Sequence, residues 1–419
     1  MRAAPAGVDP NGLSADPSLS ADGRYVAFAS QASNLGPIAG RRRIFNIYLF
    51  DFGAGRATLI SKGRDGSPAN GPSTIPSVSA NGQVVAFVSQ ATNLVAHTPR
   101  HVISDIFVRD GSGPIRLVSV GFGGVQPDAS SAQPVVSADG RFVAFTSAAD
   151  NLVAGDDNAM PDVFVSDLAT GRIQRVSISG SGRQATGASS QGSIRGSFNP
   201  SISADGHLVS FTSTATNLVP HDRNGLPDVF VRNRVRGATR RVSLASNGRG
   251  QNASIGAPFS QISDLSADGH YVVFDSNASN LARGDRNGHT NIFRHSLVSG
   301  RTKLVGTNAR GRSGDNDSFA PATSADGRVT VFNSFADNLV SPLAPGPNVF
   351  AQDLATGKTT TLDVAVDGGP RGAELDAQLL QQAAVSANGH AVAFVSGADN
   401  LVAGDHNGAD DVFVRTITR

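Results

Sequence analysis

The sequence predicts an all-β protein, a seven-bladed β-propeller made of four-stranded antiparallel blades. Three observations predict this fold. A Ser-Ala-Asp-Gly or Ser-Ala-Asn-Gly motif occurs seven times, about 60 residues apart, which is a period typical of repeat architectures. Each motif is followed at fixed spacing by a Phe, a second Ser and an Asn-Leu pair. Each repeat also contains four short segments with β-strand composition. The motifs begin at Ser20, Ser79, Ser137, Ser203, Ser266, Ser324 and Ser386.

The strands of one unit are clearest around the fourth motif. Residues 200–203 form the first predicted strand, and Asp205-Gly206 predicts a tight hairpin turn. Residues 207–213 and 228–232 form the second and third strands. A Gly-containing turn leads to the fourth strand, as at 174–177 in the preceding unit. Four-stranded units repeated around an axis form a propeller. Because one blade cannot bury both of its faces alone, residues 1–419 are predicted to form a single domain.

The unit boundaries define the blades and the two faces of the ring. The predicted blades occupy about 17–63, 76–121, 134–179, 200–246, 263–308, 321–366 and 383–419. The seventh unit has no clear fourth strand. Residues 2–6 could supply it, although Ala3-Ala-Pro-Ala is poor strand material and Pro has no N–H to donate, so the mode of closure stays open. The connections after the second and fourth strands are long and emerge together, so we expect a ligand on this long-loop face. Residues 374–383 have the composition of a short helical turn.

Three motifs carry a resemblance to a known family. Ser-Ala-Asp-Gly, Val-Ala-Phe-x-Ser and Asp-Val-Phe-Val-x-Asp resemble the TolB-like, PD40-type (WD40-like) β-propeller repeats of bacteria. The resemblance covers nearly the whole chain and implies the fold, but propellers have many functions. The chain departs from TolB itself in having no Trp before the Asp-Gly turn, no N-terminal α/β domain, and seven repeats instead of six. The partner-binding role of TolB is therefore not transferred.

The composition limits the classes of partner. The net charge is +1 and only 16% of residues are charged, which argues against nucleic acid or an anionic membrane as an electrostatic partner. Cys is absent, which excludes disulfides and thiolate metal sites. No apolar segment approaches the length of a membrane span. The repeats begin almost at Met1, which a removed signal peptide would explain, so we expect a secreted or periplasmic monomer.

The connections between the second and third strands contain the best candidate metal ligands. Four of them carry an Asp-x-Asn pair followed by a further Asp or Asn. Such oxygen side chains resemble a calcium-binding loop, since Ca²⁺ takes about six to eight oxygen ligands. The same residues also suit a tight turn in which Asp and Asn bind their own backbone, and the sequence leaves both interpretations open. Any calcium would be structural. The candidate ligands are Asp156, Asn158, Asp162, Asp222, Asn224, Asp228, Asp285, Asn287, Asn291, Asp405, Asn407 and Asp411.

The sequence supports three hypotheses of function. It contains no Gly-x-Ser-x-Gly, His-Glu-x-x-His, Walker or Rossmann motif. The first hypothesis is a non-catalytic exported binding or scaffold propeller that recognises a protein or a cell-envelope glycan through the long-loop face. The second is a polysaccharide lyase or hydrolase acting at the channel mouth. The third is a calcium-dependent lectin, although the chain has no Trp and three Tyr for sugar stacking. Candidate acid–base carboxylates for an enzyme are Asp128, Asp315, Asp317, Glu374 and Asp376.

Overall fold

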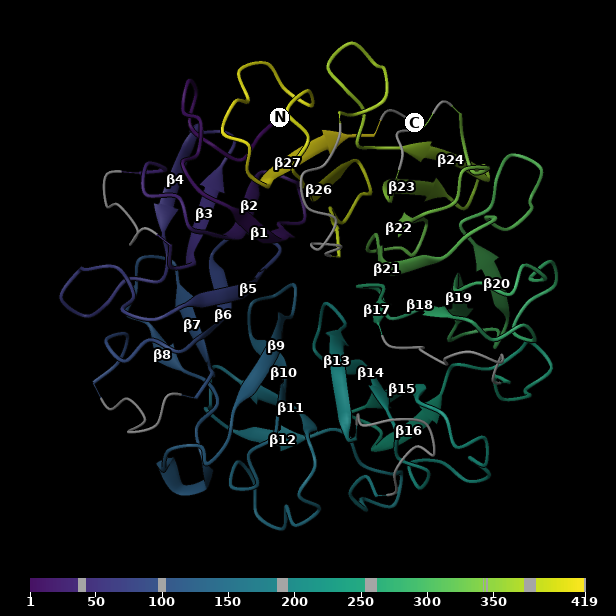
Figure 1. Ribbon diagram of the computed structural model, residues 1–419. Coiled ribbons are helices and arrows are strands. Elements are labelled where there is room, and N and C mark those ends of the chain that lie inside the picture. Colours follow the sequence, from purple (N-terminus) through teal and green to yellow (C-terminus); the bar gives the residue numbers. More distant parts are fainter. Residues whose placement is uncertain are drawn as a thin grey trace.

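The computed structural model describes residues 1–36, 43–96, 103–186, 195–252, 262–341, 343, 346–372 and 382–417. Its strands form seven antiparallel sheets arranged as blades around a central axis (Figure 1). Six sheets have four strands, and the seventh, β25-β26-β27, has three. The predicted all-β, seven-bladed propeller is therefore confirmed. In the described ranges the helical structure is the 3₁₀ turn η1 (Phe122–Gly124). No helix in these ranges is long and apolar enough to cross a membrane.

Within each blade the strands follow one another outward from the axis in chain order. The first strands are β1 (Ser14–Leu19), β5 (Ser73–Val78), β9 (Ser131–Val136), β13 (Ser197–Ile202), β17 (Ser263–Leu265), β21 (Ser318–Thr323) and β25 (Ala384–Val385). The second strands are β2 (Tyr25–Ser30), β6 (Val84–Ser89), β10 (Phe142–Ser147), β14 (Leu208–Ser213), β18 (Tyr271–Ser276), β22 (Val329–Ser334) and β26 (Ala391–Ser396). The third strands are β3 (Asn46–Asp51), β7 (Asp105–Asp110), β11 (Asp162–Asp167), β15 (Asp228–Asn233), β19 (Asn291–Ser296), β23 (Asn348–Asp353) and β27 (Asp411–Thr416). The outer strands are β4 (Arg56–Leu59), β8 (Arg116–Leu117), β12 (Ile173–Arg175), β16 (Ala238–Arg241), β20 (Thr302–Val305) and β24 (Lys358–Thr361).

The core of each blade contains a pair of aromatic rings on its two middle strands. Phe145 of β10 lies opposite Phe164 of β11, and their ring centroids are 5.9 Å apart. The same pair occurs in every blade at 5.7–6.0 Å, with Tyr48 as the second ring in the first blade. Burying each ring contributes about 1.5–3 kcal/mol. The Phe of the repeat motif is thus a core residue.

The first strands contain a β-bulge. Five of them hold a residue with a φ of 49° to 55° directly before a Pro, namely Asp16, Ile75, Gln133, Asn199 and Ala320. The pairing with the second strand shifts its register at these points. A bulge tolerates the missing N–H of Pro and turns the preceding side chain to a new direction. These five strands consequently begin three residues before the blade starts suggested by the sequence, at 17, 76, 134, 200 and 321.

The Asn-Leu pair of each repeat joins two loops of the long-loop face. In the fourth blade, Asn217 Nδ2 donates to Gln184 O (2.9 Å), and Asn217 Oδ1 accepts from Thr186 N (2.9 Å). Leu218 beside it is buried. The Asn is therefore a partner for loop backbone, and the Leu is part of the core beneath it. The equivalent contacts are made by Asn34, Asn93, Asn151, Asn280, Asn338 and Asn400.

The two ends of the chain meet in the seventh blade (Figure 1). Ala3 N donates to Val412 O (2.8 Å), and Val414 N donates to Met1 O (2.7 Å). Arg2 lies opposite Phe413, in the position that an outer strand takes in the other blades. Backbone hydrogen bonds therefore connect the N-terminal segment to β27 and close the ring.

Candidate functional site

The Asp-x-Asn loop of the fourth blade folds around an arginine. Arg241, in the outer strand β16, places Nη1 2.9 Å from Asp222 Oδ1 and 3.1 Å from Asp228 Oδ2. Asn224 Nδ2 donates to Asp228 Oδ2 (3.0 Å), and Asn224 Oδ1 accepts from Leu226 N (3.2 Å). Both carboxylates are buried. The loop therefore encloses two carboxylates with one guanidinium between them.

The loop of the third blade has the same arrangement. Arg175, in β12, lies 2.5 Å from Asp156 Oδ1 and 3.5 Å from Asp162 Oδ2. Asn158 Nδ2 donates to Asp162 Oδ2 (2.8 Å), as Asn224 does in the fourth blade. The arginine occupies the same place in the sheet in both blades, opposite the aromatic ring of the third strand.

In the seventh blade the N-terminal segment supplies this arginine. Arg2 Nη1 lies 3.1 Å from Asp405 Oδ1 and from Asp411 Oδ2, and 2.7 Å from Asp9 Oδ1. Asn407 Nδ2 donates to Asp411 Oδ2 (2.9 Å). Sequence reasoning missed these arginines, although their constant place in the outer strand was a usable signal.

The fifth blade keeps the first Asp of the loop, but its outer strand has no arginine in the corresponding place. Leu304 takes the place opposite the ring of Phe293. Asn291 Nδ2 donates to Asp285 Oδ1 (3.0 Å) and to Asn287 Oδ1 (2.9 Å). Asp285 Oδ2 is buried without a hydrogen-bond partner, and burial raises the pKa of Asp285 to about 6. Of the four Asp-x-Asn loops, this is the one in which a buried carboxylate has no cation beside it.

Burial also raises the pKa of the carboxyls that surround the arginines. Burial and then repulsion by Asp228 raise the pKa of Asp222 to about 6, with Arg241 acting in the opposite direction. Burial raises the pKa of Asp411 to about 7 against the hydrogen bond from Asn407 and the charge of Arg2. The structure thus brings the predicted ligands of each loop together, in an environment that disfavours their full ionisation.

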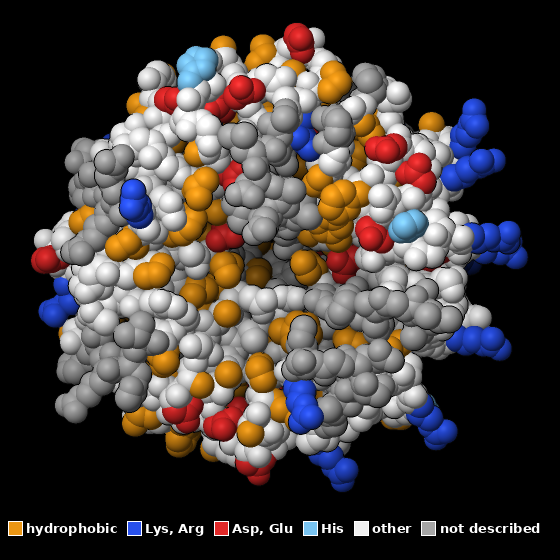
Figure 2. Space-filling model, viewed as in Figure 1, with side chains coloured by type: hydrophobic (Ala, Val, Ile, Leu, Met, Phe, Trp, Pro, Cys, Tyr) orange, Lys and Arg blue, Asp and Glu red, His pale blue; other side chains and the backbone are white. Residues whose placement is uncertain are grey.

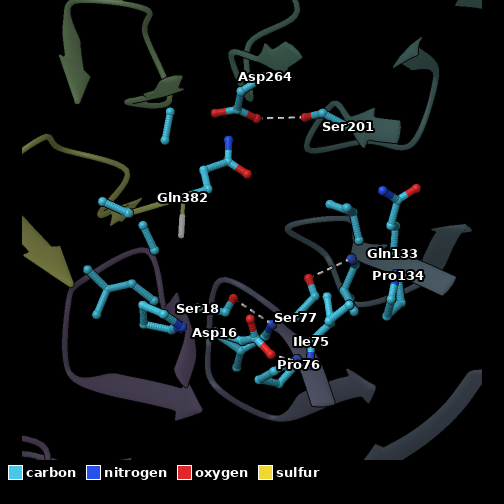
Figure 3. Close-up of a pocket in the computed structure, with 18 of the residues that line it drawn as sticks. Asp16, Ser18, Ile75, Pro76, Ser77, Gln133, Pro134, Ser201, Asp264 and Gln382 are labelled. Carbon is cyan, nitrogen blue, oxygen red and sulfur yellow. Dashed lines mark hydrogen bonds between the residues drawn. The ribbon is translucent and has the colours of Figure 1, made fainter. Parts of the chain in front are cut away.

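A cavity lies at the axis of the ring and is lined mainly by the first strands of the blades; we call it the channel. The cavity has a volume of about 490 Å³. Asp16 and Asp264 lie on opposite sides of it, and Gln133 and Gln382 extend from other parts of the wall (Figure 3). No Lys, Arg or His occurs among the described residues that line the cavity. The described part of the wall therefore has two acidic side chains and no basic one.

Polar side chains of the channel wall bind the backbone of the neighbouring blade. Ser18 Oγ accepts from Val78 N (3.1 Å), and Ser77 Oγ accepts from Val136 N (2.9 Å). The first strand is the inner edge of each sheet, so its unpaired N–H groups need partners. These side chains supply them and join the blades rigidly. The same contact, at 2.8–3.1 Å, joins Asp16 to Ile75 N, Gln133 to Asn199 N, Ser201 to Leu265 N and Asp264 to Thr323 N.

The two acidic residues of the channel are held in place and partly desolvated. Asp264 accepts a second hydrogen bond from Ser201 Oγ (2.7 Å), drawn in Figure 3. Burial raises the pKa of Asp264 and of Asp16, and their hydrogen bonds act in the opposite direction. The sequence does not indicate these residues, because Asp16 precedes the predicted first strand and Asp264 stands where three of the other repeats have Ser and three have Val or Ala.

The loop carboxylates proposed as acid–base candidates bind loop backbone. Asp128 Oδ1 accepts from Asp150 N (3.0 Å), and Asp315 Oδ1 accepts from Asp337 N (2.9 Å). Asp317 Oδ1 accepts from Thr290 N (2.7 Å). None of these three is among the residues that line the channel. Glu374 and Asp376 lie outside the described residues, as does most of the predicted helical turn at 374–383.

Comparisons with known proteins give matches in structure. No protein-family model and no curated sequence matches the chain. An oligogalacturonate lyase from Vibrio parahaemolyticus is 13% identical with a TM-score of 0.54, over 100% of this chain and 93% of that one. An oligogalacturonate lyase in complex with manganese is 14% identical with a TM-score of 0.56, over 100% and 92% of the two chains. TolB from Acinetobacter baumannii is 16% identical with a TM-score of 0.42, over 94% and 80%.

At these identities the two lyases share a propeller fold with this chain, and fold alone does not determine activity. The repeat motifs resemble those of TolB-like propellers. In fold, the chain is a seven-bladed β-propeller.

Proposed function

We propose that the protein is a non-catalytic, exported binding propeller that holds a protein partner of the cell envelope at its long-loop face. The observation that supports this most is the channel wall, whose polar side chains bind the neighbouring blade and whose two carboxylates face the cavity. Such a wall is rigid and electronegative. It suits the binding of a complementary group better than proton transfer, which needs an acid and a base positioned around a substrate.

The acidic side chains of the channel indicate which chemical groups of a ligand would bind there. A Lys, an Arg or an amino terminus that enters the cavity would compensate the charge of Asp16 and Asp264. Gln133 and Gln382 offer amide groups to an extended backbone. A cavity of about 490 Å³ accommodates a short segment and not a folded domain. We therefore infer that the partner inserts an extended basic segment while the surrounding loops contact the rest of its surface.

The affinity for such a segment depends on pH. Burial raises the pKa of Asp264 in the free protein, so a bound cation stabilises the ionised form and displaces the proton. Below the raised pKa the group is neutral and the attraction is lost. Affinity should therefore increase as the pH rises through the pKa of Asp264 and decrease on acidification.

Fluorescence anisotropy with a labelled lysine-bearing peptide, and with its glutamine counterpart, tests the proposal. We expect the lysine peptide to bind more tightly and Asp264→Asn to weaken it about tenfold, as expected for losing one charge pair. Asp367→Asn, an exposed change in another loop, is the matched control and should bind normally. Equal affinity for both peptides, or unchanged binding by Asp264→Asn, would contradict a basic ligand in the channel.

The polysaccharide lyase or hydrolase hypothesis has one specific observation in its favour. Asp9, Asp405 and Asp411 lie close enough together to hold a metal ion, and one similar structure is a lyase in complex with manganese. Arg2 lies among these carboxylates, so an ion would have to replace its guanidinium. An anionic oligogalacturonate would also meet the acidic channel wall. Incubation of the protein with polygalacturonate and manganese tests the lyase hypothesis. Unsaturated products, detected by their ultraviolet absorbance, would overturn a purely binding role.

Structural calcium stays a prediction for the four Asp-x-Asn loops. The arginines indicate which of these loops would bind calcium most readily. In the third, fourth and seventh blades an ion would compete with Arg175, Arg241 or Arg2 for the carboxylates. In the fifth blade no ion pair holds Asp285, and its Oδ2, like Asp222 Oδ2 in the fourth blade, has no hydrogen-bond partner within the described residues. The calcium-dependent lectin hypothesis needs exposed ions in several equivalent loops, and the three arginines disfavour it.

We expect calcium to raise the melting temperature through the loop of the fifth blade. Asp285→Asn should abolish the increase, whereas Asp222→Asn should retain it, because Asp222 is already paired with Arg241. Differential scanning fluorimetry in calcium and in chelator measures both. An equal calcium effect in the wild type and in Asp285→Asn would exclude this loop as the site.

A further inference from the structure

The net charge of +1 conceals a strong separation of charge along the chain. Residues 229–314 contain thirteen Lys and Arg and four Asp, a net charge of +9. The remainder of the chain contains 22 basic and 30 acidic residues, a net charge of −8. Because this stretch spans the third and outer strands of the fourth blade and nearly all of the fifth, the positive charge is concentrated in one part of the ring.

The structure exposes much of this charge at the outer edge of the ring. Lys and Arg side chains project in a row from the right-hand edge in Figure 2, the side on which Figure 1 places β16 and β20. We call six exposed residues of the stretch 229–314 the basic sector. All six are exposed, and none forms an ion pair in the described part of the chain. The basic sector consists of Arg236, Arg249, Arg301, Lys303, Arg310 and Arg312.

The acids that neutralise arginines in other blades are replaced here. The last residue of the third strand is Asp51, Asp167 or Asp353 in three other blades, where it pairs with an Arg that directly precedes the second strand. The equivalent residues of the fourth and fifth blades are Asn233 and Ser296. The arginine of this pair is replaced as well, by His207 and His270, so each of these two blades lacks both members of the pair and keeps no carboxylate at this position of its third strand.

The positive groups beside the sector also crowd one another. Arg240 donates Nη1 to Leu297 O (2.9 Å), which brings the outer strand of the fourth blade against the fifth. Burial and then the charge of Arg236 lower the pKa of Arg240, and burial and then Arg240 lower the pKa of His295 to about 4. Like charges held together repel, and a bound anion relieves this repulsion.

We propose that the basic sector binds an acidic polysaccharide, a flexible chain that carries carboxylate or sulfate groups along its length. The sector extends over the full height of the ring edge, from Arg236 in the turn between β15 and β16 to Arg249 beyond the far end of β16. It continues around the edge to Arg301 and Lys303 in the next blade. A linear polyanion can follow such a convex strip and contact all of these charges together. This inference does not depend on what enters the channel.

Two other classes of polyanion fit the surface less well. A flat anionic bilayer can contact one face of the ring but not both ends of the outer strands. Single-stranded nucleic acid binds through exposed aromatic rings on which its bases stack. The described aromatic residues of this stretch are buried, except Tyr271, whose ring lies under the guanidinium of Arg294 at 4.4 Å. The surface therefore offers charge without stacking platforms, which suits an acidic polysaccharide.

Binding of heparin and of alginate, a sulfated and a carboxylated polysaccharide, tests the proposal by biolayer interferometry. The test variant is Arg301→Gln/Lys303→Gln/Arg310→Gln/Arg312→Gln. The control is Arg56→Gln/Arg64→Gln/Arg172→Gln/Arg183→Gln, which removes four exposed charges from other blades. None of these eight side chains forms a hydrogen bond or an ion pair within the described structure, so both variants should fold. Circular dichroism and the melting temperature check this.

We expect wild type and control to bind with an affinity that falls steeply with salt, and the test variant to bind at least about tenfold more weakly at physiological ionic strength. A preference for heparin or for alginate identifies the acidic group. Equal weakening in both variants would show unspecific charge attraction and overturn the sector as the site. Tighter binding of single-stranded DNA or of phosphatidylserine vesicles at the same salt concentration would overturn the polysaccharide as its ligand.

Discussion

One residue position shows how burial governs the charges of this propeller. The first residue of each third strand is buried in all seven blades and is Asp or Asn. Where this residue is Asp, as at Asp228, an arginine in the outer-strand position normally lies beside it. Where it is Asn, as at Asn291, that position of the outer strand holds a Leu or a Thr. The second blade is the exception, because Asp105 has Leu117 in the arginine position. Burial raises the pKa of Asp105 to about 6, while the hydrogen bond from Ser119 acts in the opposite direction.

Asp105→Asn should therefore stabilise the protein at neutral pH. The folded pKa of Asp105 lies above its unfolded value, so the folded state is penalised when the carboxyl ionises. The penalty is fully present above about pH 6 and is lost as the pH falls through 6 toward the unfolded value. We expect a gain of about 1–3 kcal/mol at pH 7, estimated from the size of the shift, and none near pH 4. Urea denaturation of wild type and variant across this range measures the difference.

Asn46→Asp is the reciprocal experiment in the first blade. It places a carboxyl where Leu59 replaces the arginine, so it should destabilise the protein at pH 7 and less at low pH. A pH-independent effect of either substitution would show that packing, and not ionisation, determines the preference.

At the scale of the element, each outer strand is matched to the loop that it supports. The outer strands of the third and fourth blades carry Arg175 and Arg241, which hold two carboxylates of the Asp-x-Asn loop. Strand β20 carries Leu304, and its loop has Asn291 in place of the second carboxylate. A buried carboxylate without its cation is unfavourable by several kcal/mol, so the loop and the outer strand cannot change independently.

Arg241→Leu should destabilise the protein by about 3–5 kcal/mol, because Asp222 and Asp228 stay buried without their cation. Adding Asp228→Asn reproduces the fifth blade and should recover most of the loss. A double-mutant cycle in urea measures this coupling. Arg249→Leu is the control, since Arg249 is exposed and should change stability little. Additive effects of the two substitutions would contradict the matching of strand and loop.

At the scale of the whole molecule, two sets of contacts hold the ring together. Side chains of the first strands join neighbouring blades around the channel, and the N-terminal segment joins the first blade to the last. Arg2 contributes its guanidinium to the loop of the seventh blade as Arg241 does in the fourth. Because a blade cannot stay folded without its neighbours, loosening this closure should weaken the whole ring.

Arg2→Gln should lower stability by about 3 kcal/mol, since Asp405 and Asp411 lose their cation. We expect a single cooperative unfolding transition at lower urea concentration, with hydrogen exchange increased first in β26 and β27. Arg56→Gln removes an exposed charge and serves as the control. An unchanged midpoint would show that backbone pairing alone closes the ring.

The sequence by itself determined the architecture. The architecture follows from the period of the Ser-Ala-Asp-Gly motif, the Asp-Gly turns and the Phe of each second strand. These features depend on local geometry, and they recur in every repeat. The role of Asn217 and its equivalents as loop anchors could be predicted for the same reason, because the side-chain amide of an Asn in a turn commonly forms hydrogen bonds with nearby backbone groups.

Only the tertiary structure decided which charges stand together. Arg241 is nineteen residues from Asp222, and Arg2 is 403 residues from Asp405, yet both arginines take the same place in a blade. Asp16 and Asp264 face one cavity from blades on opposite sides of the ring, and the basic sector forms where two outer strands become neighbours. The physical reason is that hydrogen bonds of turns and strands act between near residues, whereas electrostatic interactions act across space and depend on closure of the ring.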